Sequence, residues 1–150
     1  MNIDTKDSVH PSFVDIIRTL SPIDCKVLKY IITNHTPPSF GFYEIQALKT
    51  NSSEYKVILP YATAISFYAF DEVACSIDNL IRNSLVSISD NGYINDEIYK
   101  EIDNNPEYIN FKDECEKSIS ESGDYKFHTE KKAIKYTYLG LSFYNICVEE

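Results

Sequence analysis

The side chains that most often carry catalysis are scattered through this sequence. Its three histidines, His10, His35 and His128, lie far apart along the chain. The sequence contains no G-x-S-x-G elbow, no H-E-x-x-H motif and no glycine-rich phosphate loop, and it has only four glycines. Because each of these chemistries needs its residues at a fixed spacing, the sequence predicts none of them.

Two patterns typical of nucleases are incomplete. Glu54-Tyr55-Lys56 matches the E-x-K half of a metal-dependent nuclease motif, but no Pro-Asp pair precedes it on a predicted strand. Arg18 and Arg82 are the only arginines, and neither has a histidine at the spacing that follows arginine in common ribonucleases. We therefore predict no nuclease activity from these motifs.

A metal site is not predicted either. Asp113, Glu114 and Glu116 cluster beside Lys112 and Lys117 in one predicted helix. A divalent cation needs carboxylates that converge from several elements, so we interpret this cluster as a solvated helix face. We expect a protein that is not an enzyme and that uses no metal or cofactor; a toxin-like enzyme with an unrecognised site is an alternative.

The cysteines also give no sign of chemistry. Cys25, Cys75, Cys115 and Cys147 form no C-x-x-C pair and have no histidine at metal-ligand spacing. We assign each of them to the apolar face of a predicted helix, as with Cys115, which follows Tyr108 and Phe111 at helical spacing. We predict that all four are small buried side chains in a reducing compartment.

The remaining candidates are binding surfaces, and the first is a helix predicted over residues 70–83. Its apolar residues follow helical spacing, so the opposite face carries Glu72, Asp78, Asn79 and Arg82. In a DNA-reading helix, Asn79 and Arg82 could contact base edges, whereas the two acids would repel phosphates. A solvated face and a contact surface for another protein are the other interpretations, and both are favoured over DNA.

The second candidate surface is basic. Residues 124–136 carry four lysines against two acids. Lys131, Lys132 and Lys135 could bind a phosphate backbone. Lysines at such positions also protect the edge of a β-ribbon from aggregation, and we favour this structural interpretation.

The overall charge bears on the class of partner. The chain has 14 Lys and Arg against 23 Asp and Glu, a net charge of −9. A surface of that sign repels nucleic acid at long range. The twelve tyrosines suit protein surfaces, where tyrosine is a frequent anchor. We expect a protein partner or a homo-oligomer; nucleic acid is possible but disfavoured.

Length and composition indicate one soluble domain. The chain has 150 residues, 43% of them hydrophobic. We place the domain at residues 10–150, after a loose N-terminus at residues 1–9. No apolar run is long enough to span a membrane, and the first residues lack the order of a signal peptide. The cytoplasm is the expected location.

Periodicity and turn residues predict the elements. Their order is helices at residues 11–20 and 21–33, strands at 42–48 and 55–59, a helix at 70–83, a strand at 85–88, a turn at 90–93, and helices at 96–102, 105–120 and 138–148. Ser21 and Asp24 have the positions of a capping box, and Asn105 that of an N-cap. Pro60 should close the hairpin, and residues 61–70 are ambiguous between helix and extended chain.

One further segment decides the predicted fold. Residues 126–136 alternate in part and have a polar tip at residues 129–132, which predicts a β-ribbon. A helix leading into a strand, followed by a ribbon, is the outline of a winged helix. The predicted fold class is α+β and mostly helical, with a winged helix-like core, inserted helices, and a C-terminal β-ribbon plus helix.

Several blocks of sequence carry a resemblance. They are H-P-S-F-V-D-I-I from His10, L-S-P-I-D from Leu20, S-I-D-N-L from Ser76 with L-V-S-I from Leu85, and Y-T-Y-L-G-L-S-F-Y-N-I-C from Tyr136. In this order they resemble the Abi-alpha family of bacteria, associated by name with abortive infection, a defence against phage. The chain departs from the family pattern where L-G-L-I is replaced by N-S-L-V and L-T-x-x-G by Y-T-Y-L-G.

The resemblance implies a biological setting and no catalytic residues. Only nine residues precede the first block, which fits either a short member or an excised C-terminal module. Together with the residue patterns, it predicts a non-catalytic interaction module of a bacterial abortive-infection protein that acts through protein contacts. A DNA-binding winged-helix regulator is the alternative.

Overall fold

The computed structural model of the chain describes residues 10–33, 39–89 and 96–148. Its helices are α1 (Ser12–Thr19), α2 (Pro22–Thr33), α3 (Phe70–Arg82), α4 (Glu97–Asp103), α5 (Pro106–Ser122) and α6 (Tyr138–Phe143), which continues as a π-helical segment at Tyr144–Val148. Its strands are β1 (Ser39–Lys49), β2 (Tyr55–Ala62), β3 (Val86–Ser89) and β4 (Tyr125–Tyr136). The α+β class predicted from the sequence is confirmed.

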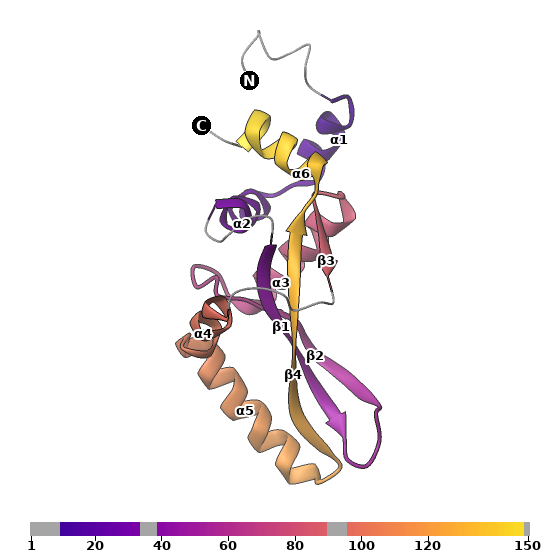
Figure 1. Cartoon of the computed structure of the whole chain (residues 1–150), viewed down its shortest axis with the longest axis vertical. Coiled ribbons are helices and arrows are strands. Elements are labelled where there is room, and N and C mark those ends of the chain that lie inside the picture. The colour runs from indigo at the N-terminus through magenta and orange to yellow at the C-terminus, as the bar shows by residue number, and fades with distance from the viewer. Residues whose placement is uncertain (1–9, 34–38, 90–95, 149–150) are drawn as a thin grey trace.

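The sheet is antiparallel, with the strand order β2-β1-β4-β3. β1 and β4 form its centre and pair from Ser39 opposite Lys135 to Lys49 opposite Tyr125. β3 pairs only with residues 133–136 of β4. Beyond β3, residues 42–49 of β1 and 125–132 of β4 extend with β2 as a curved arm. α5 runs alongside the arm, α4 lies at the inner end of α5, and α1, α2 and α6 lie toward the opposite end of the molecule (Figure 1).

One face of the sheet, here called the α3 face, packs against α2 and α3. Alternate residues of β1 point to opposite faces. Phe40 of β1 lies in edge contact with Tyr30 of α2, with ring centroids 5.6 Å apart. Phe42 contacts the ring of Tyr61 on β2. Beyond Phe42, the same face becomes polar along the arm.

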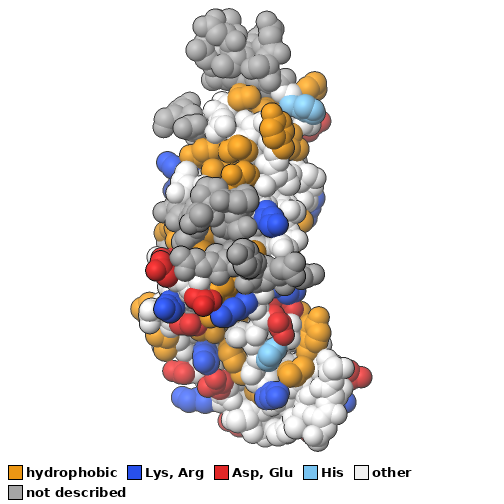
Figure 2. Space-filling view, in the orientation of Figure 1, with side chains coloured by type: hydrophobic (Ala, Val, Ile, Leu, Met, Phe, Trp, Pro, Cys, Tyr) orange, Lys and Arg blue, Asp and Glu red, His pale blue; other side chains and the backbone are white. Residues whose placement is uncertain are grey.

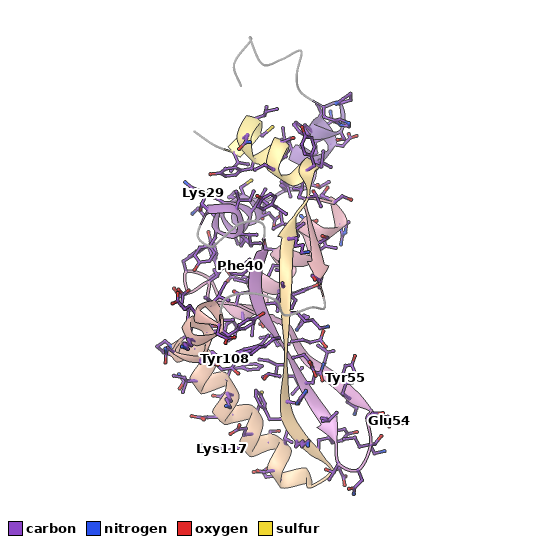
Figure 3. The ribbon with its side chains drawn as sticks, viewed as in Figure 1. Lys29, Phe40, Glu54, Tyr55, Tyr108 and Lys117 are labelled. Atoms are coloured by element: carbon purple, nitrogen blue, oxygen red, sulfur yellow. The ribbon has the colours of Figure 1, made fainter. Side chains whose placement is uncertain are left out.

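The opposite face, here called the α5 face, packs against α4 and α5. Tyr43 of β1 contacts Tyr99 of α4 and Tyr108 of α5, and Tyr108 points from its helix toward the strands (Figure 3). Gly41 allows α4 to approach the sheet closely, because a Cβ there would lie 2.8 Å from Cγ2 of Ile98. Aromatic rings thus fill the space between this face and the two helices.

Local signals place the helix ends as predicted. The backbone N–H of Ser21 donates to the Asp24 carboxylate at 2.9 Å, and the N–H of Asp24 donates to the Ser21 hydroxyl at 3.2 Å, which completes a capping box. Asn105 caps α5 by accepting from the N–H of Glu107. Gly123 ends that helix with a φ of 72°, a conformation that glycine adopts without strain.

The β-ribbon predicted at residues 126–136 is wrong. β4 runs without a turn from Tyr125 to Tyr136 and lies inside the sheet. Residues 129–132 contain no glycine, asparagine or proline, the residues that tight turns favour. They are polar because the arm is only partly covered by helices. The winged helix-like core is not confirmed, since its wing is one strand of a four-stranded sheet.

Two smaller predictions about the hairpin also change. β2 continues through Pro60 to Ala62, so the proline does not close the hairpin. β2 is an edge strand, and its register with β1 shifts next to Pro60, where the missing N–H is not needed for pairing. The ambiguous residues 61–70 are the end of β2, a link at residues 63–69, and the first residue of α3.

Some expectations concern residues that the structure does not describe. The loose N-terminus at residues 1–9, the helix-ending prolines Pro37 and Pro38, and the turn at residues 90–93 all lie outside the described residues. Among the helices that are described, none has the length and apolar character needed to cross a lipid bilayer.

The start of α6 packs on the backbone of the α3–β3 link. The Thr137 hydroxyl accepts from the N–H of Gly140 and donates to the carbonyl of Ser84, and the Thr137 N–H donates to the carbonyl of Leu85. A Cβ on Gly140 would overlap that Leu85 carbonyl. The helix can approach this closely only with glycine at that position.

We therefore predict that Gly140→Ala lowers the free energy of unfolding by about 3 kcal/mol or more, since neither backbone can move aside easily. Gly123→Ala is the comparison: its φ is strained for alanine but nothing lies within 4 Å of a new Cβ, so about 1 kcal/mol is expected. Urea denaturation of both variants measures the difference. Equal losses would show that the α6 contact is looser than described.

Candidate functional site

α3 has one buried and one outward face. Phe70, Val73, Ile77 and Leu80 are buried at helical spacing. The residues on the outward side that are exposed are Asp71, Glu72, Cys75, Asp78 and Arg82. The helix predicted at residues 70–83 is thus confirmed, and it does present a polar surface.

Two of the predicted binding residues have structural partners. Asp78 accepts a hydrogen bond of 2.8 Å from the hydroxyl of Tyr61 on β2. The amide of Asn79 donates to the carbonyl of Thr19 and to the carboxylate of Asp24, at 2.9 and 2.8 Å. Asn79 therefore links α3 to the α1–α2 connection. Its side chain would have to break both hydrogen bonds to contact a base edge.

The same side of α3 borders a groove. The groove lies between α3 and the start of α2, and its volume is about 490 Å³. Its polar lining includes Asp24, Asp71, Glu72, Ser76 and Asn79. We call this the acidic groove. Of its members, only Glu72 and Asn79 are among the binding residues predicted from the sequence.

The charges of the acidic groove are left largely unbalanced. Among the residues that the structure describes, no lysine or arginine lines it. Within the described part of the chain, neither Asp71 nor Glu72 takes part in an ion pair. Both lie in the first turn of α3, where carboxylates interact favourably with the helix dipole. That interaction stabilises the helix but leaves the groove negative.

One buried hydroxyl in the groove also lacks a partner. Ser76 is 3% exposed, and its Oγ makes no hydrogen bond within the described residues. A buried polar atom without a partner costs about 1–3 kcal/mol. A donor that enters the groove could satisfy this oxygen. No pattern in the sequence points to it, because Ser76 occupies an otherwise ordinary helical position.

The three predicted lysines do not form one surface. Lys131 points to the α5 face, where its Nζ lies 5.1 Å above the ring of Tyr99 and 3.6 Å from Asp96. Lys132, the next residue along the strand, points to the α3 face and pairs with Glu44. Lys135 is exposed, on the same face as Lys131. Lys135 lies where β4 pairs with both β1 and β3, whereas at Lys131 and Lys132 β4 pairs with β1 alone. The predicted β-ribbon is absent, but protection of a strand edge by Lys131 and Lys132 stays a prediction.

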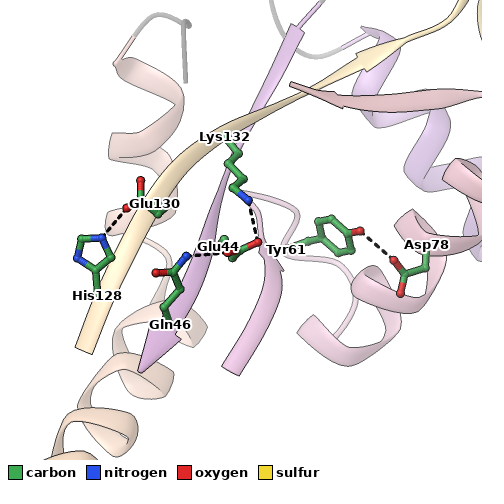
Figure 4. Close-up of polar contacts among 7 residues, drawn as sticks. All are labelled: Glu44, Gln46, Tyr61, Asp78, His128, Glu130 and Lys132. Carbon is green, nitrogen blue, oxygen red and sulfur yellow. Dashed lines mark hydrogen bonds and ion pairs between the residues drawn. The ribbon is translucent and has the colours of Figure 1, made fainter. Parts of the chain in front are cut away.

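Lys132 belongs to a row of polar contacts across the sheet (Figure 4). Its Nζ lies 2.9 Å from Oε2 of Glu44, and the other oxygen of Glu44 accepts from the Gln46 amide at 2.7 Å. On β4, Nε2 of His128 lies 2.7 Å from Oε1 of Glu130. Gln46, His128 and Lys132 line a groove of about 550 Å³ on the arm. Here opposite charges are already paired.

Tyr61 connects this row of polar side chains to α3, because its hydroxyl donates a hydrogen bond to Asp78. Burial is the largest cause that raises the pKa of the Tyr61 hydroxyl, and its hydrogen bond to Asp78 and the charge of Glu44 raise it further. The phenol therefore stays protonated and serves as a donor. This contact joins the arm to the helical end of the molecule.

The arm contains an E-x-K arrangement that the sequence search did not single out. Glu130 and Lys132 share a face of β4, opposite Glu44 on β1. The segment that was singled out, residues 54–56, is exposed at the tip of the hairpin. Among the described residues, no group of three or more His, Cys, Asp or Glu side chains is placed to hold a metal ion.

The prediction that all four cysteines are buried is wrong. Cys75 is exposed beside the acidic groove, and the other three are partly buried. Helical spacing placed Cys75 near the apolar face, but it lies one position outside that face. Burial raises the pKa of Cys25, Cys115 and Cys147.

Two of the sequence blocks that carry the family resemblance meet at the acidic groove. Asp24 ends the block that begins at Leu20, and the block from Ser76 to Leu80 lies on α3. The model of the abortive infection alpha family matches residues 1–147. The chain belongs to this family. The family name gives abortive infection as the biological setting of the protein that carries the acidic groove and the arm.

The fold of this chain also occurs in another solved protein structure. It is similar to the solved structure of an uncharacterized protein from the hydrocarbon-degrading marine bacterium Alcanivorax borkumensis SK2. The TM-score is 0.54 and the identity 13%, over 97% of this chain and 96% of that chain. At this identity the likeness concerns the fold alone. No curated protein matches the chain.

The Glu44–Lys132 pair gives a first test of the site. Their side chains are 14% and 21% exposed, so Lys132→Met should cost about 2 kcal/mol by leaving a largely desolvated carboxylate. In a double-mutant cycle with Glu44→Gln we expect a coupling energy of about 1–2 kcal/mol. The exposed pair Lys49–Glu54 is the matched control, with an expected coupling below about 0.5 kcal/mol.

Thiol labelling gives a second test, which concerns access to the acidic groove. Because Cys75 is exposed and burial raises the pKa of the other three thiols, iodoacetamide at neutral pH should modify Cys75 first. Peptide mass mapping over time measures the order. In Cys75→Ser the fast phase should vanish. A first adduct at Cys147 or Cys25 would contradict the described burial.

Proposed function

We propose that this protein acts in abortive infection by binding a protein partner, and that a basic side chain of the partner enters the acidic groove. The single observation that carries the proposal is the groove itself. It gathers Asp24, Asp71 and Glu72, and its described lining contains no cation. Elsewhere in the described structure, comparable carboxylates such as Glu44 and Glu130 already have a partner.

The shape and lining of the groove suit an arginine or lysine. Ile23 and Cys75 supply an apolar wall for the methylene stem of such a side chain. The Ser76 hydroxyl and the carboxylates supply acceptors for its N–H groups. Arginine is enriched at protein interfaces, where it binds carboxylates through two parallel hydrogen bonds.

The placement of the other candidate residues supports protein over DNA as the partner. Asn79 is held by Thr19 and Asp24, and Lys131 and Lys132 point to opposite faces of the sheet. On the described part of the surface in Figure 2, basic and acidic side chains are mixed over the lower half. Arg82 is exposed, but a single cation gives little phosphate affinity.

We place this binding in the cytoplasm, the location predicted from the sequence. The four free cysteines support this, because a reducing compartment keeps thiols unpaired.

A phage challenge of cells that express the protein tests the proposal. In the double variant Asp71→Lys/Glu72→Lys, two added cations should repel the partner's basic side chain. We expect protection to fall by about tenfold or more, the effect of losing one strong interface contact. The matched control is Asp113→Lys/Glu121→Lys on α5, which makes the same charge change on exposed helix positions and should protect like wild type.

A direct probe separates binding from protection. N-acetyl-arginine methylamide is titrated into the labelled purified protein, and the amide signals of Cys75 and Ser76 are followed by NMR. Saturable shifts that are absent in Asp71→Lys/Glu72→Lys support the groove as an arginine site. If the charge reversal leaves both phage protection and these shifts unchanged while the variant remains folded, the proposed function is wrong.

A further inference from the structure

A second groove, independent of the acidic one, lies on the other side of α2. The exposed side of α2 and the link at residues 63–69 border an open groove of about 490 Å³. The lining is Lys26, Lys29, Tyr30, Thr33, Phe67 and Tyr68. We call this the aromatic groove. This groove could not be predicted from the sequence, because its two halves are more than thirty residues apart in the chain.

Three aromatic rings form one wall of the aromatic groove. Phe67 contacts Tyr30 and Tyr68, with ring centroids 5.7 and 5.1 Å apart. Tyr30 is in turn fixed against Phe40 of the core. Phe67 is nevertheless 48% exposed. A ring held by its neighbours but open to solvent is a ready surface on which a planar ligand can stack.

Two lysines stand at the edge of this wall. Lys26 and Lys29 are exposed and one helical turn apart, and Lys29 lies on the outer side of α2 (Figure 3). Nζ of Lys26 is 5.9 Å from the centre of the Tyr68 ring. Within the described residues, neither lysine forms an ion pair. The groove is thus a basic spot on an acidic protein.

We propose that the aromatic groove binds a free mononucleotide, with the base stacked on Phe67 and the phosphate between Lys26 and Lys29. The chemistry of the lining matches both halves of such a ligand: a planar ring for the aromatic wall and an anion for the two ammonium groups. The volume lies within the range of small-molecule sites.

The negative net charge of the protein favours a free nucleotide over a nucleic acid strand as the ligand. A strand would run out of the groove onto a protein that carries a net charge of −9, and every further phosphate would be repelled. A mononucleotide places all of its charge at the two lysines. One acid does lie nearby, since the charge of Glu101 on α4 contributes to raising the pKa of Tyr30, after burial.

The test is a titration of the purified protein with adenosine 5′-monophosphate, followed by NMR of labelled Phe and Tyr rings. We expect saturation with a Kd of about 1 mM or tighter. Phe67→Ala should weaken binding about tenfold by removing the stacking surface. Lys26→Ala/Lys29→Ala should weaken it about tenfold or more and flatten its salt dependence. Glu101→Gln should tighten it about twofold by removing a repulsive charge.

Matched controls make each outcome decisive. Tyr138→Ala removes another exposed ring, and Lys117→Ala/Lys126→Ala removes two other exposed lysines; both should bind like wild type. Adenosine and ribose 5-phosphate, which each carry half of the ligand, should bind at least about tenfold more weakly. Absence of ring shifts, or equal binding in Phe67→Ala, overturns the proposal. Tighter binding of a single-stranded oligoadenylate than of the monophosphate overturns its commitment to a free nucleotide.

Discussion

The pairing of β1 with β4 is the interaction on which the rest of the structure depends. The two strands match residue for residue from Ser39 to Lys49, and every other layer is built on them. Because side chains alternate along a strand, this register sends Phe40 and Phe42 to α2 and α3, and Gly41 and Tyr43 to α4 and α5. A slip by one residue would exchange the two aromatic layers and bury charges such as Glu44.

The same pairing explains why polar side chains form one set of contacts near α3 and a separate set along the arm. Near α3 the sheet is covered, and charges collect at helix ends and links, as in the acidic groove. Along the arm the α3 face is open, so Glu44, Gln46 and Lys132 satisfy one another across the strands. On this face of the arm, Glu44 and Lys132 therefore balance each other's charge, whereas the acidic groove and the aromatic groove both present unbalanced charge. Recognition by charge is accordingly expected at α2 and α3.

Much of the fold could be predicted from the sequence because its signals are local. The capping box at Ser21, the N-cap at Asn105 and the apolar spacing in residues 70–83 each need only neighbouring residues. The continuity of β4 could not be predicted in this way, because its polar residues are explained by β1, far away in the chain. The candidate site was half predicted: Glu72 lies on the outward face of α3, but Asp24 and Ser76 become groove residues only when α2 meets α3.

The position of β4 in the chain has a consequence for biosynthesis. It is a central strand, yet it is made well after its partner β1, and its contact between Lys132 and Glu44 spans 88 residues. Such a high contact order slows folding. The β1–β2 hairpin and α3 emerge from the ribosome well before their partner strand, with the inner edge of β1 unpaired. Until β4 is made, that edge is open to pairing with another chain, which makes the unfinished sheet prone to aggregation.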